Sequence, residues 1–191
     1  MKRIYCFICT AAIIAVILSG CQSNEAKLSE RYVGSLDTEG FSLDAPVFTD
    51  MKEMEEASEL IITGKRIGAP EKLQGNIMTN TVFTIQVEEV VKGPQELNTI
   101  KFFQLGEPSS DAYETKLKED TTYLLFLTEN YTRDTETGPE ILYNSISFEQ
   151  GIFEIDGSGL LKAYSRIGIA PQLEKKEFSL FKQELESAVQ P

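Results

Sequence analysis

The chain has 191 residues, of which 41% are hydrophobic and 25% charged, a composition typical of one globular domain. Collagen-like, low-complexity and polytopic membrane classes are therefore excluded. The 30 acidic and 18 basic residues give a net charge of -12, which argues against nucleic-acid partners, because these are bound through Lys and Arg. The sequence contains no histidine, and this excludes Ser-His and Cys-His catalytic pairs, histidine acid or base catalysis and histidine metal sites.

Residues 1–20 have the pattern of a secretory signal peptide. Lys2 and Arg3 precede an apolar run of about 15 residues, shorter than the roughly 20 that a membrane-spanning helix needs. The run ends in Leu18-Ser19-Gly20-Cys21, which resembles the lipobox of bacterial lipoproteins. That resemblance implies cleavage before Cys21 and diacylation of its thiol. A signal peptide cut elsewhere, with Cys21 left as a free thiol, is the alternative.

The number of cysteines agrees with a lipid anchor. Cys6 and Cys9 lie inside the leader, so the mature chain keeps only Cys21 and cannot form an internal disulfide. Two acyl chains hold a protein stably at a bilayer, whereas one chain binds only marginally. We therefore expect a lipid-anchored protein at the extracytoplasmic face of the cell membrane, and the lack of disulfides favours a Gram-positive surface.

After the anchor, the chain is expected to divide into a tether and one domain. Residues 21–45 are polar and show no lasting helical or alternating period, which predicts a lipidated cysteine followed by a flexible tether. The folded domain is predicted over 46–191. A short helix is expected to begin at Thr49 or Asp50, whose side chain can cap free amide groups, and to end near Ser58.

Six or seven short strands are predicted next, followed by a terminal helix. The strands are expected at 60–65, 83–91, 98–105, 123–128, 141–148, 151–156 and 160–164, with a bulge near 88–91. Segment 123–128 is apolar on both faces and is therefore predicted to be central. Since no helices separate the strands, the pattern favours an antiparallel barrel or sandwich. An amphipathic helix over 174–189, with Phe178, Phe181, Leu185 and Ala188 on one face, is expected to cover it.

The order of these segments resembles that of a known group of proteins. The matching stretches are Glu59-Leu60-Ile61-Ile62-Thr63-Gly64-Lys65, Phe83-Thr84-Ile85-Gln86-Val87-Glu88-Glu89-Val90-Val91-Lys92-Gly93, Thr99-Ile100-Lys101-Phe102 and Tyr123-Leu124-Leu125-Phe126-Leu127. They are similar to small exported bacterial β-domains, which in turn resemble the OB-like barrel of netrin and tissue-inhibitor-of-metalloprotease modules. The resemblance implies an OB-like fold over about 59–156. The animal inhibitors bind proteases through a disulfide-held N-terminal cysteine ridge, which this chain lacks, so no inhibitory residue is carried over.

Acidic residues give two further possibilities. Two carboxylates facing each other across a cleft would permit glycoside hydrolysis. The candidates are Glu88, Glu89, Glu114, Glu119, Asp120, Glu129, Asp134, Glu136 and Glu140. Segment 129–138 also offers oxygen ligands to Ca²⁺, but Thr135 stands where an EF-hand loop has glycine, and Arg133 adds a competing positive charge. A solvated acidic surface and an exposed hairpin loop are the simpler interpretations.

The expected function is therefore that of a non-catalytic, lipid-anchored surface domain that binds a protein or a cell-envelope component. No enzyme activity, cofactor, metal or nucleic-acid partner is expected. Loops 106–120 and 129–140 are the predicted contact surface, because binding residues concentrate on loops carried by rigid sheets. The residues selected within them are Tyr113, Tyr131, Asp134 and Glu136. A carboxylate-dependent hydrolase of envelope glycans and a weak divalent-cation binder are the alternatives.

Overall fold

The part of the chain described by the structure is mainly β, as the sequence predicts. The computed structural model describes residues 45–75, 78–109 and 116–189. All of these residues belong to one unit, Val33–Pro191. The predicted leader, the predicted lipidation site Cys21, almost all of the predicted tether and the candidate contact residue Tyr113 lie outside the described residues.

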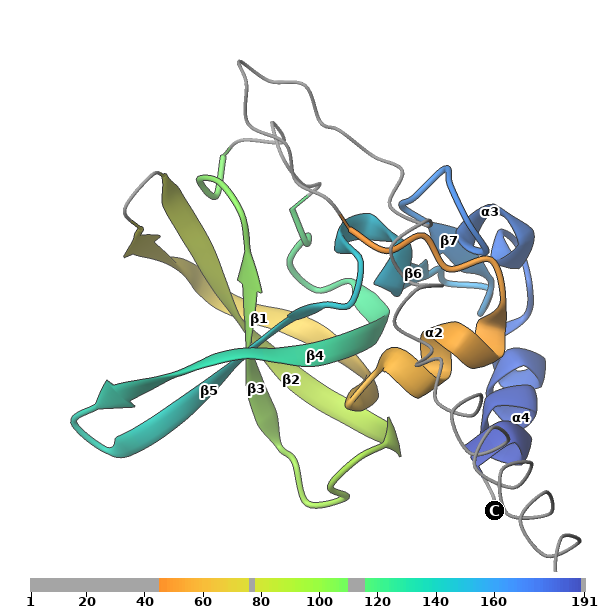
Figure 1. Ribbon diagram of the computed structural model, residues 1–191, viewed down its shortest axis with the longest axis horizontal. Helices are drawn as coiled ribbons and strands as arrows, with labels where there is room; N and C mark the ends of the chain where they lie inside the picture. The colour runs from red at the N-terminus through yellow and green to blue at the C-terminus, as the bar shows by residue number, and fades with distance from the viewer. Residues whose placement is uncertain (1–44, 76–77, 110–115, 190–191) are drawn as a thin grey trace, which may run out of the picture. The chain divides into compact units, whose positions relative to one another are not determined.

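Seven strands make up one sheet, and five of them close into a ring (Figure 1). Their bounds are β1 Leu60–Gln74, β2 Thr79–Lys92, β3 Thr99–Gln104, β4 Thr122–Thr135, β5 Gly138–Ser145, β6 Ile152–Ile155 and β7 Leu161–Ala163. Their order in the sheet is β1-β2-β3-β5-β4-β6-β7, and an additional β1–β4 pairing closes the ring.

The expectation of a wholly antiparallel sheet is wrong at one pair. Lys101 and Phe102 of β3 run parallel to Leu142 and Tyr143 of β5, whereas the other strand pairs are antiparallel. The reason is topological, since five strands cannot alternate in direction all the way round a closed ring. One neighbouring pair has to be parallel.

Short helices flank the ring on the side of β6 and β7 (Figure 1). They are α2 Met51–Ala57, the 3-10 turn η1 Phe148–Gly151, α3 Ala170–Leu173 and the longer α4 Phe178–Val189. The predicted first helix is confirmed, and its cap is Asp50, whose Oδ1 accepts the Lys52 amide at 2.8 Å. The last helix begins later than the predicted residue 174. The preceding residues instead lie along β7, where the Lys175 amide donates to the Leu161 carbonyl at 2.7 Å.

The domain has two apolar cores, which meet on opposite faces of β4. Tyr123, Leu125 and Leu127 pack with side chains from the other ring strands, in the ring interior. Leu124 and Phe126 point the other way and pack against α2, α3 and α4. The prediction that 123–128 is central is therefore confirmed, because each of its faces is buried in a different core.

Two pairs of strands continue beyond the ring as long hairpins, and here the sequence-based bounds are wrong. β1 runs on to Gln74 past Gly68 and Pro70, which fall at an irregularity in the pairing between Ile67 and Glu71. β4 runs on to Thr135, so the predicted 129–140 loop is mostly a β4–β5 hairpin. We call residues 66–74 with 79–80 the first arm, and residues 128–135 with 138–141 the second arm, because β2 from Thr81 and β5 from Leu142 pair with β3 and belong to the ring.

The predicted bulge at 88–91 is confirmed by the β1–β2 register. Ile61 pairs with Lys92 and Ile62 with Val90, so that Val91 has no partner in β1. A second shift leaves out Glu88, because Thr63 pairs with Glu89 and Gly64 with Val87. Such bulges increase the local twist of a strand, which suits a small closed ring.

Candidate functional site

The side chains of β2 and β3 alternate between the ring interior and an outer face. Phe83, Ile85, Ile100 and Phe102 belong to the interior core. The residues between them therefore point outward, since successive side chains of a strand lie on opposite faces. On this outer face, the Lys101 ammonium donates to the Thr84 hydroxyl of the neighbouring strand at 3.0 Å.

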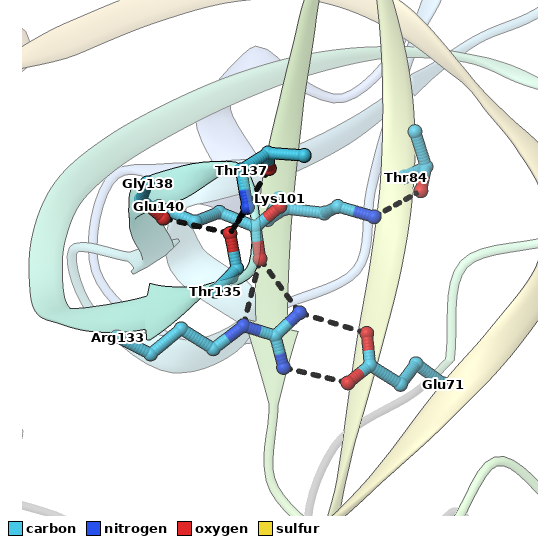
Figure 2. Close-up of polar contacts among 8 residues, drawn as sticks. All are labelled: Glu71, Thr84, Lys101, Arg133, Thr135, Thr137, Gly138 and Glu140. Atoms are coloured by element: carbon cyan, nitrogen blue, oxygen red, sulfur yellow. Dashed lines mark hydrogen bonds and ion pairs between the residues drawn. The ribbon is translucent and has the colours of Figure 1, made fainter.

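Arg133 of the second arm and Glu71 of the first arm meet above this outer face (Figure 2). The guanidinium binds the carboxylate with two hydrogen bonds, from Nη1 to Oε1 at 2.6 Å and from Nη2 to Oε2 at 2.8 Å. Arg133 Nε also donates to Glu140 Oε2 at 2.7 Å, across the β4–β5 pair. One arginine therefore joins three strands.

The contact between the arms shows that both arms bend over the outer face. Where β1 and β4 pair directly, Lys65 lies opposite Thr122 and Leu60 opposite Leu127. Glu71 and Arg133 lie beyond opposite ends of that pairing, a separation of roughly 50 Å along straight strands. They meet only because the arms curl towards each other over β2, β3 and β5. We call the outer face of β2, β3 and β5 between the arms the trough.

The electrostatics of the trough favour the charged forms of its ions. The hydrogen bonds from Arg133 hold the pKa of Glu71 below its usual range, and Lys101 acts in the same direction. The same hydrogen bonds to Glu71 raise the pKa of Arg133. Glu71 is thus held as an anion by Arg133, and Glu140 contacts the same guanidinium. The two carboxylates are arranged as a bridge between the arms and not as a proton donor and acceptor.

Beside the bridge, the trough carries an aromatic pair. Phe103 of β3 and Tyr131 of β4 stack edge to face, with ring centroids 6.1 Å apart. Tyr131 is 39% exposed, and burial raises the pKa of its phenol, which stays protonated at neutral pH. It pairs with Leu142, which is fully buried even though it lies on the outer side of the ring. The aromatic pair therefore covers an apolar floor.

One polar atom on the same face has no hydrogen-bond partner among the described residues. Asn144 follows Leu142 by two positions in β5 and therefore shares its face. Its Oδ1 is buried and unpaired, while its Nδ2 donates to the Ser145 carbonyl at 3.3 Å. The trough thus combines apolar and aromatic surface with hydrogen-bonding groups, which is the composition of a binding surface.

The structure separates the residues that the sequence grouped as a contact surface. Tyr131 lies in a strand rather than in a loop, and it faces the trough. Asp134, opposite Pro139, is exposed and points to the other side of the second arm, because it alternates with Arg133. Glu136 lies in the turn between β4 and β5. Only Tyr131 of these residues takes part in the trough.

Sequence reasoning missed the partners of Tyr131. Arg133 was recognised only as a charge that disfavours Ca²⁺ binding, and Phe103 was predicted only as part of the strand at 98–105. Glu71 lies 62 residues before Arg133, and no local pattern connects the two. The signal in the sequence was Arg133 itself. A basic residue within an acidic segment is expected to form ion pairs, and Arg133 pairs with Glu140 of the same segment as well as with the distant Glu71.

Other carboxylates are bound by partners of their own. Glu88 pairs with Lys65 at 2.6 Å, and Glu89 pairs with Lys182 of α4. Asp156 Oδ1 accepts the Ser158 amide at 2.8 Å and hydroxyl at 2.7 Å, which lower the pKa of this carboxyl. Asp156 thus holds the turn that joins β6 to β7. No cluster of three metal-binding side chains is found in residues 45–75, 78–109 and 116–189.

A second polar network lies where β6 and β7 join the ring. The Tyr123 hydroxyl accepts the Lys118 amide at 2.9 Å and lies 3.3 Å from the Tyr164 hydroxyl. Tyr164 donates to Glu154 at 3.1 Å, and Lys118 Nζ lies 3.3 Å from the same carboxylate. Burial is the main cause that raises the pKa of Tyr164. Burial opposes the charge of Glu154, but the Tyr164 hydroxyl and Lys118 outweigh it and lower the pKa. The network fastens β6 and β7 to the ring.

Comparison with known proteins adds no relative: no family model and no curated protein matches the chain. Within the described residues, the helices are too short or too polar to cross a bilayer.

Proposed function

We propose that the protein is a lipid-anchored, non-catalytic surface domain that binds a protein or a cell-envelope component in the trough between its arms. The anchor is Cys21, at the end of the lipobox-like sequence. The observation that carries the proposal is the partly exposed Phe103–Tyr131 pair above an apolar floor, flanked by paired ions and an unpaired amide oxygen. Tyrosine is favoured at binding surfaces because it gives a large contact area at a small entropic cost.

The strand order supports this location. A ring ordered β1-β2-β3-β5-β4 with a parallel β3–β5 pair resembles an OB-like barrel. Proteins with that barrel bind ligands on the face of strands 2 and 3, between the loops that join strands 1–2 and 4–5. The trough occupies the corresponding place. The net charge of -12 disfavours the nucleic-acid ligands that some of those proteins bind.

The hydrolase alternative receives no support from the trough. Its two carboxylates, Glu71 and Glu140, both bind Arg133, and the pKa of Glu71 is lowered. Glycoside hydrolysis requires a carboxylic acid that stays protonated at working pH, which means a raised pKa. A binding role therefore fits this geometry better than acid catalysis.

The experiment compares two exposed side chains of the second arm. Tyr131 is 39% exposed in the trough, whereas Ile141, 37% exposed, pairs with Thr132 and points to the other side. Purified Tyr131→Ala and Ile141→Ala proteins are titrated against two fractions. One is isolated cell-wall sacculi, and the other is envelope protein that was cross-linked in the membrane and then solubilised in detergent. We expect Tyr131→Ala to weaken retention on one of these fractions about tenfold or more. Equal retention of both variants would refute the trough as the binding site.

The anchor has a separate test. Replacing the acylated sulfur in a Cys21→Ser variant is expected to move the protein from the membrane fraction to the medium, since the two acyl chains provide the stable attachment. Mass spectrometry of the mature chain should show a diacylated residue 21 at its N-terminus. A Cys21→Ser protein retained at the membrane would argue against the anchor.

A further inference from the structure

The chain enters the described domain through a segment that is fixed in place. The Phe48 amide donates to Gln150 Oε1 at 3.1 Å, and the Phe48 carbonyl accepts the Ile169 amide at 2.7 Å. The Pro46 carbonyl accepts Gln150 Nε2 at 3.0 Å and also the Ser147 hydroxyl. The point where the tether reaches the domain is therefore held against the loop that precedes α3.

That loop projects an apolar side chain from a well-held backbone. Ile167 is 49% exposed, and its amide donates to the Ser165 hydroxyl at 3.2 Å. Gly168 follows with a φ of 64°, and a Cβ built there would lie 2.3 Å from the Phe48 carbonyl oxygen. Only glycine fits this close approach. The loop is thus in close contact with the backbone at Phe48, and the Ile167 side chain remains exposed to solvent.

The surface around the entry point differs in charge from the rest of the domain. Residues 163–173 contain Arg166 and no acidic residue, and residues 45–48 contain no charge, in a chain with 30 acidic residues. Three carboxylates flank this surface, of which Asp50 is exposed and accepts backbone amides at the start of α2. Glu149 is half-buried in η1, and Glu174 accepts the Ala163 amide at 2.7 Å. We call residues 46–48 and 166–169 the entry face.

The entry face and the tips of the arms lie far apart. In Figure 1, α3 and β7 are at the right of the domain, whereas the β4–β5 hairpin points to the left. A domain resting on its entry face would therefore hold the second arm and its part of the trough away from the surface to which it is tethered.

We propose that the entry face rests on the anionic headgroups of the membrane that holds the lipid anchor, with Ile167 entering the interface and Arg166 lying against lipid phosphates. The inference builds on the proposed lipid anchor at Cys21. The tether that the sequence predicts over 21–45 would span about 27 Å as a coil, which is short enough to keep the domain within reach of the bilayer. A contact of one apolar and one basic side chain is weak by itself, but tethering makes it intramolecular and gives it a high effective concentration.

The sequence offers a clean labelling strategy. The mature chain is expected to contain no cysteine besides acylated Cys21, so one introduced thiol is the only reactive group. Acylated Ile167→Cys and Ile141→Cys proteins, each carrying a fluorophore, are reconstituted into vesicles of phosphatidylcholine and phosphatidylglycerol that contain a headgroup-region quencher. We expect strong quenching at position 167 and little at position 141. In the Ile167→Cys background, Arg166→Gln should lower the contact equilibrium about fivefold, because one basic residue near an anionic surface contributes about that factor. Lys72→Gln, on the first arm, should leave it unchanged.

Each outcome decides one of the two ideas. Flotation of the labelled protein with the vesicles, together with quenching equal at positions 167 and 141, would overturn the proposed orientation and leave the anchor intact. Loss of flotation in the acylated preparation would overturn the anchor, and the orientation with it. Quenching at position 167 that rises with protein density on the vesicles would indicate contact with a second copy of the chain, which also contradicts a lipid contact.

Discussion

Arg133 is expected to stabilise the closed trough, and its replacement by methionine tests this directly. Met keeps an unbranched apolar stem in place of the arginine stem but removes the guanidinium. Four contacts are lost, two to Glu71 at 2.6 and 2.8 Å and two to Glu140 at 2.7 and 2.6 Å. The variant also leaves two facing carboxylates without their shared counter-ion.

The size of the effect follows from exposure. The Arg133 side chain is 20% exposed and that of Glu140 27%, but that of Glu71 is 45% exposed, so water screens part of the attraction. Bidentate geometry strengthens the pair relative to an ordinary surface pair. We expect Arg133→Met to lower the free energy of unfolding by about 1–2 kcal/mol, and the Glu71–Arg133 coupling to be about 1 kcal/mol.

A double-mutant cycle in urea measures that coupling. The cycle combines Glu71→Gln with Arg133→Met, and the matched control cycle uses the Lys72–Glu107 pair, which is 3.1 Å apart but 60% and 50% exposed. The control should give a coupling near zero. Because the folded pKa of Glu71 is lowered from 4.5, its contribution is complete above about pH 4.5 and is lost as the pH falls through the lowered value. The wild-type and Glu71→Gln stability curves should therefore converge in acid. A coupling equal to that of the control pair would refute the bridge as an energetic link between the arms.

Three further substitutions and one control variant, Gly157→Ala, test the fold. Asp50→Ala should lower the free energy of unfolding by about 1 kcal/mol in urea titrations, because the cap of α2 is lost, and an unchanged midpoint would show that the cap contributes nothing. Gly64→Ala should cost about 3 kcal/mol, since its Cβ would lie 2.5 Å from the Gln86 carbonyl oxygen, whereas Gly157→Ala has nothing within 4 Å and should be near neutral. Thermal denaturation that does not distinguish the two glycine variants would contradict this packing. Tyr164→Phe should cost about 1 kcal/mol and raise the pKa of the Glu154 carboxyl, which is measurable by NMR titration, and an unshifted titration would mean that the hydroxyl does not hold this carboxylate.

The core strands could be predicted because buried strands require apolar residues. Residues 60–62 and 123–127 fill space on both sides of the sheet, and all of these positions are apolar. The arms show no such run of apolar residues. Beyond Arg66, β1 pairs with β2 alone, and beyond Leu127, β4 pairs with β5 alone in the described structure. Much of each arm faces water, so polar residues, Gly68 and Pro70 are tolerated, and the sequence resembles that of a loop.

The trough was less predictable than the strands, because it depends on contacts between distant segments. Tyr131 was selected as a contact residue for its expected place in a loop, whereas the structure has it in β4 with 39% of its side chain exposed. Its neighbour Phe103 comes from another strand, and Glu71 from the other arm. These residues become neighbours only because the ring is curved. The spacing of residues within one segment of sequence does not predict that curvature. Asp134 and Glu136 were selected for their charge, and charge alone does not tell which side of a hairpin a residue occupies.

The parallel β3–β5 pair links the topology of the ring to the trough. Closure of five strands requires one parallel pair, and here that pair extends over only two residues of each strand. β3 has six residues, whereas its neighbours β2 and β5 belong to hairpins with strands of up to 15 residues. The hairpins therefore overhang a short central strand, and the twist of the sheet brings their far ends together above it. Among the described residues, no other strand pairs with the arms at that place. The side-chain bridge through Arg133 joins the arms there, as backbone hydrogen bonds join neighbouring strands elsewhere in the ring.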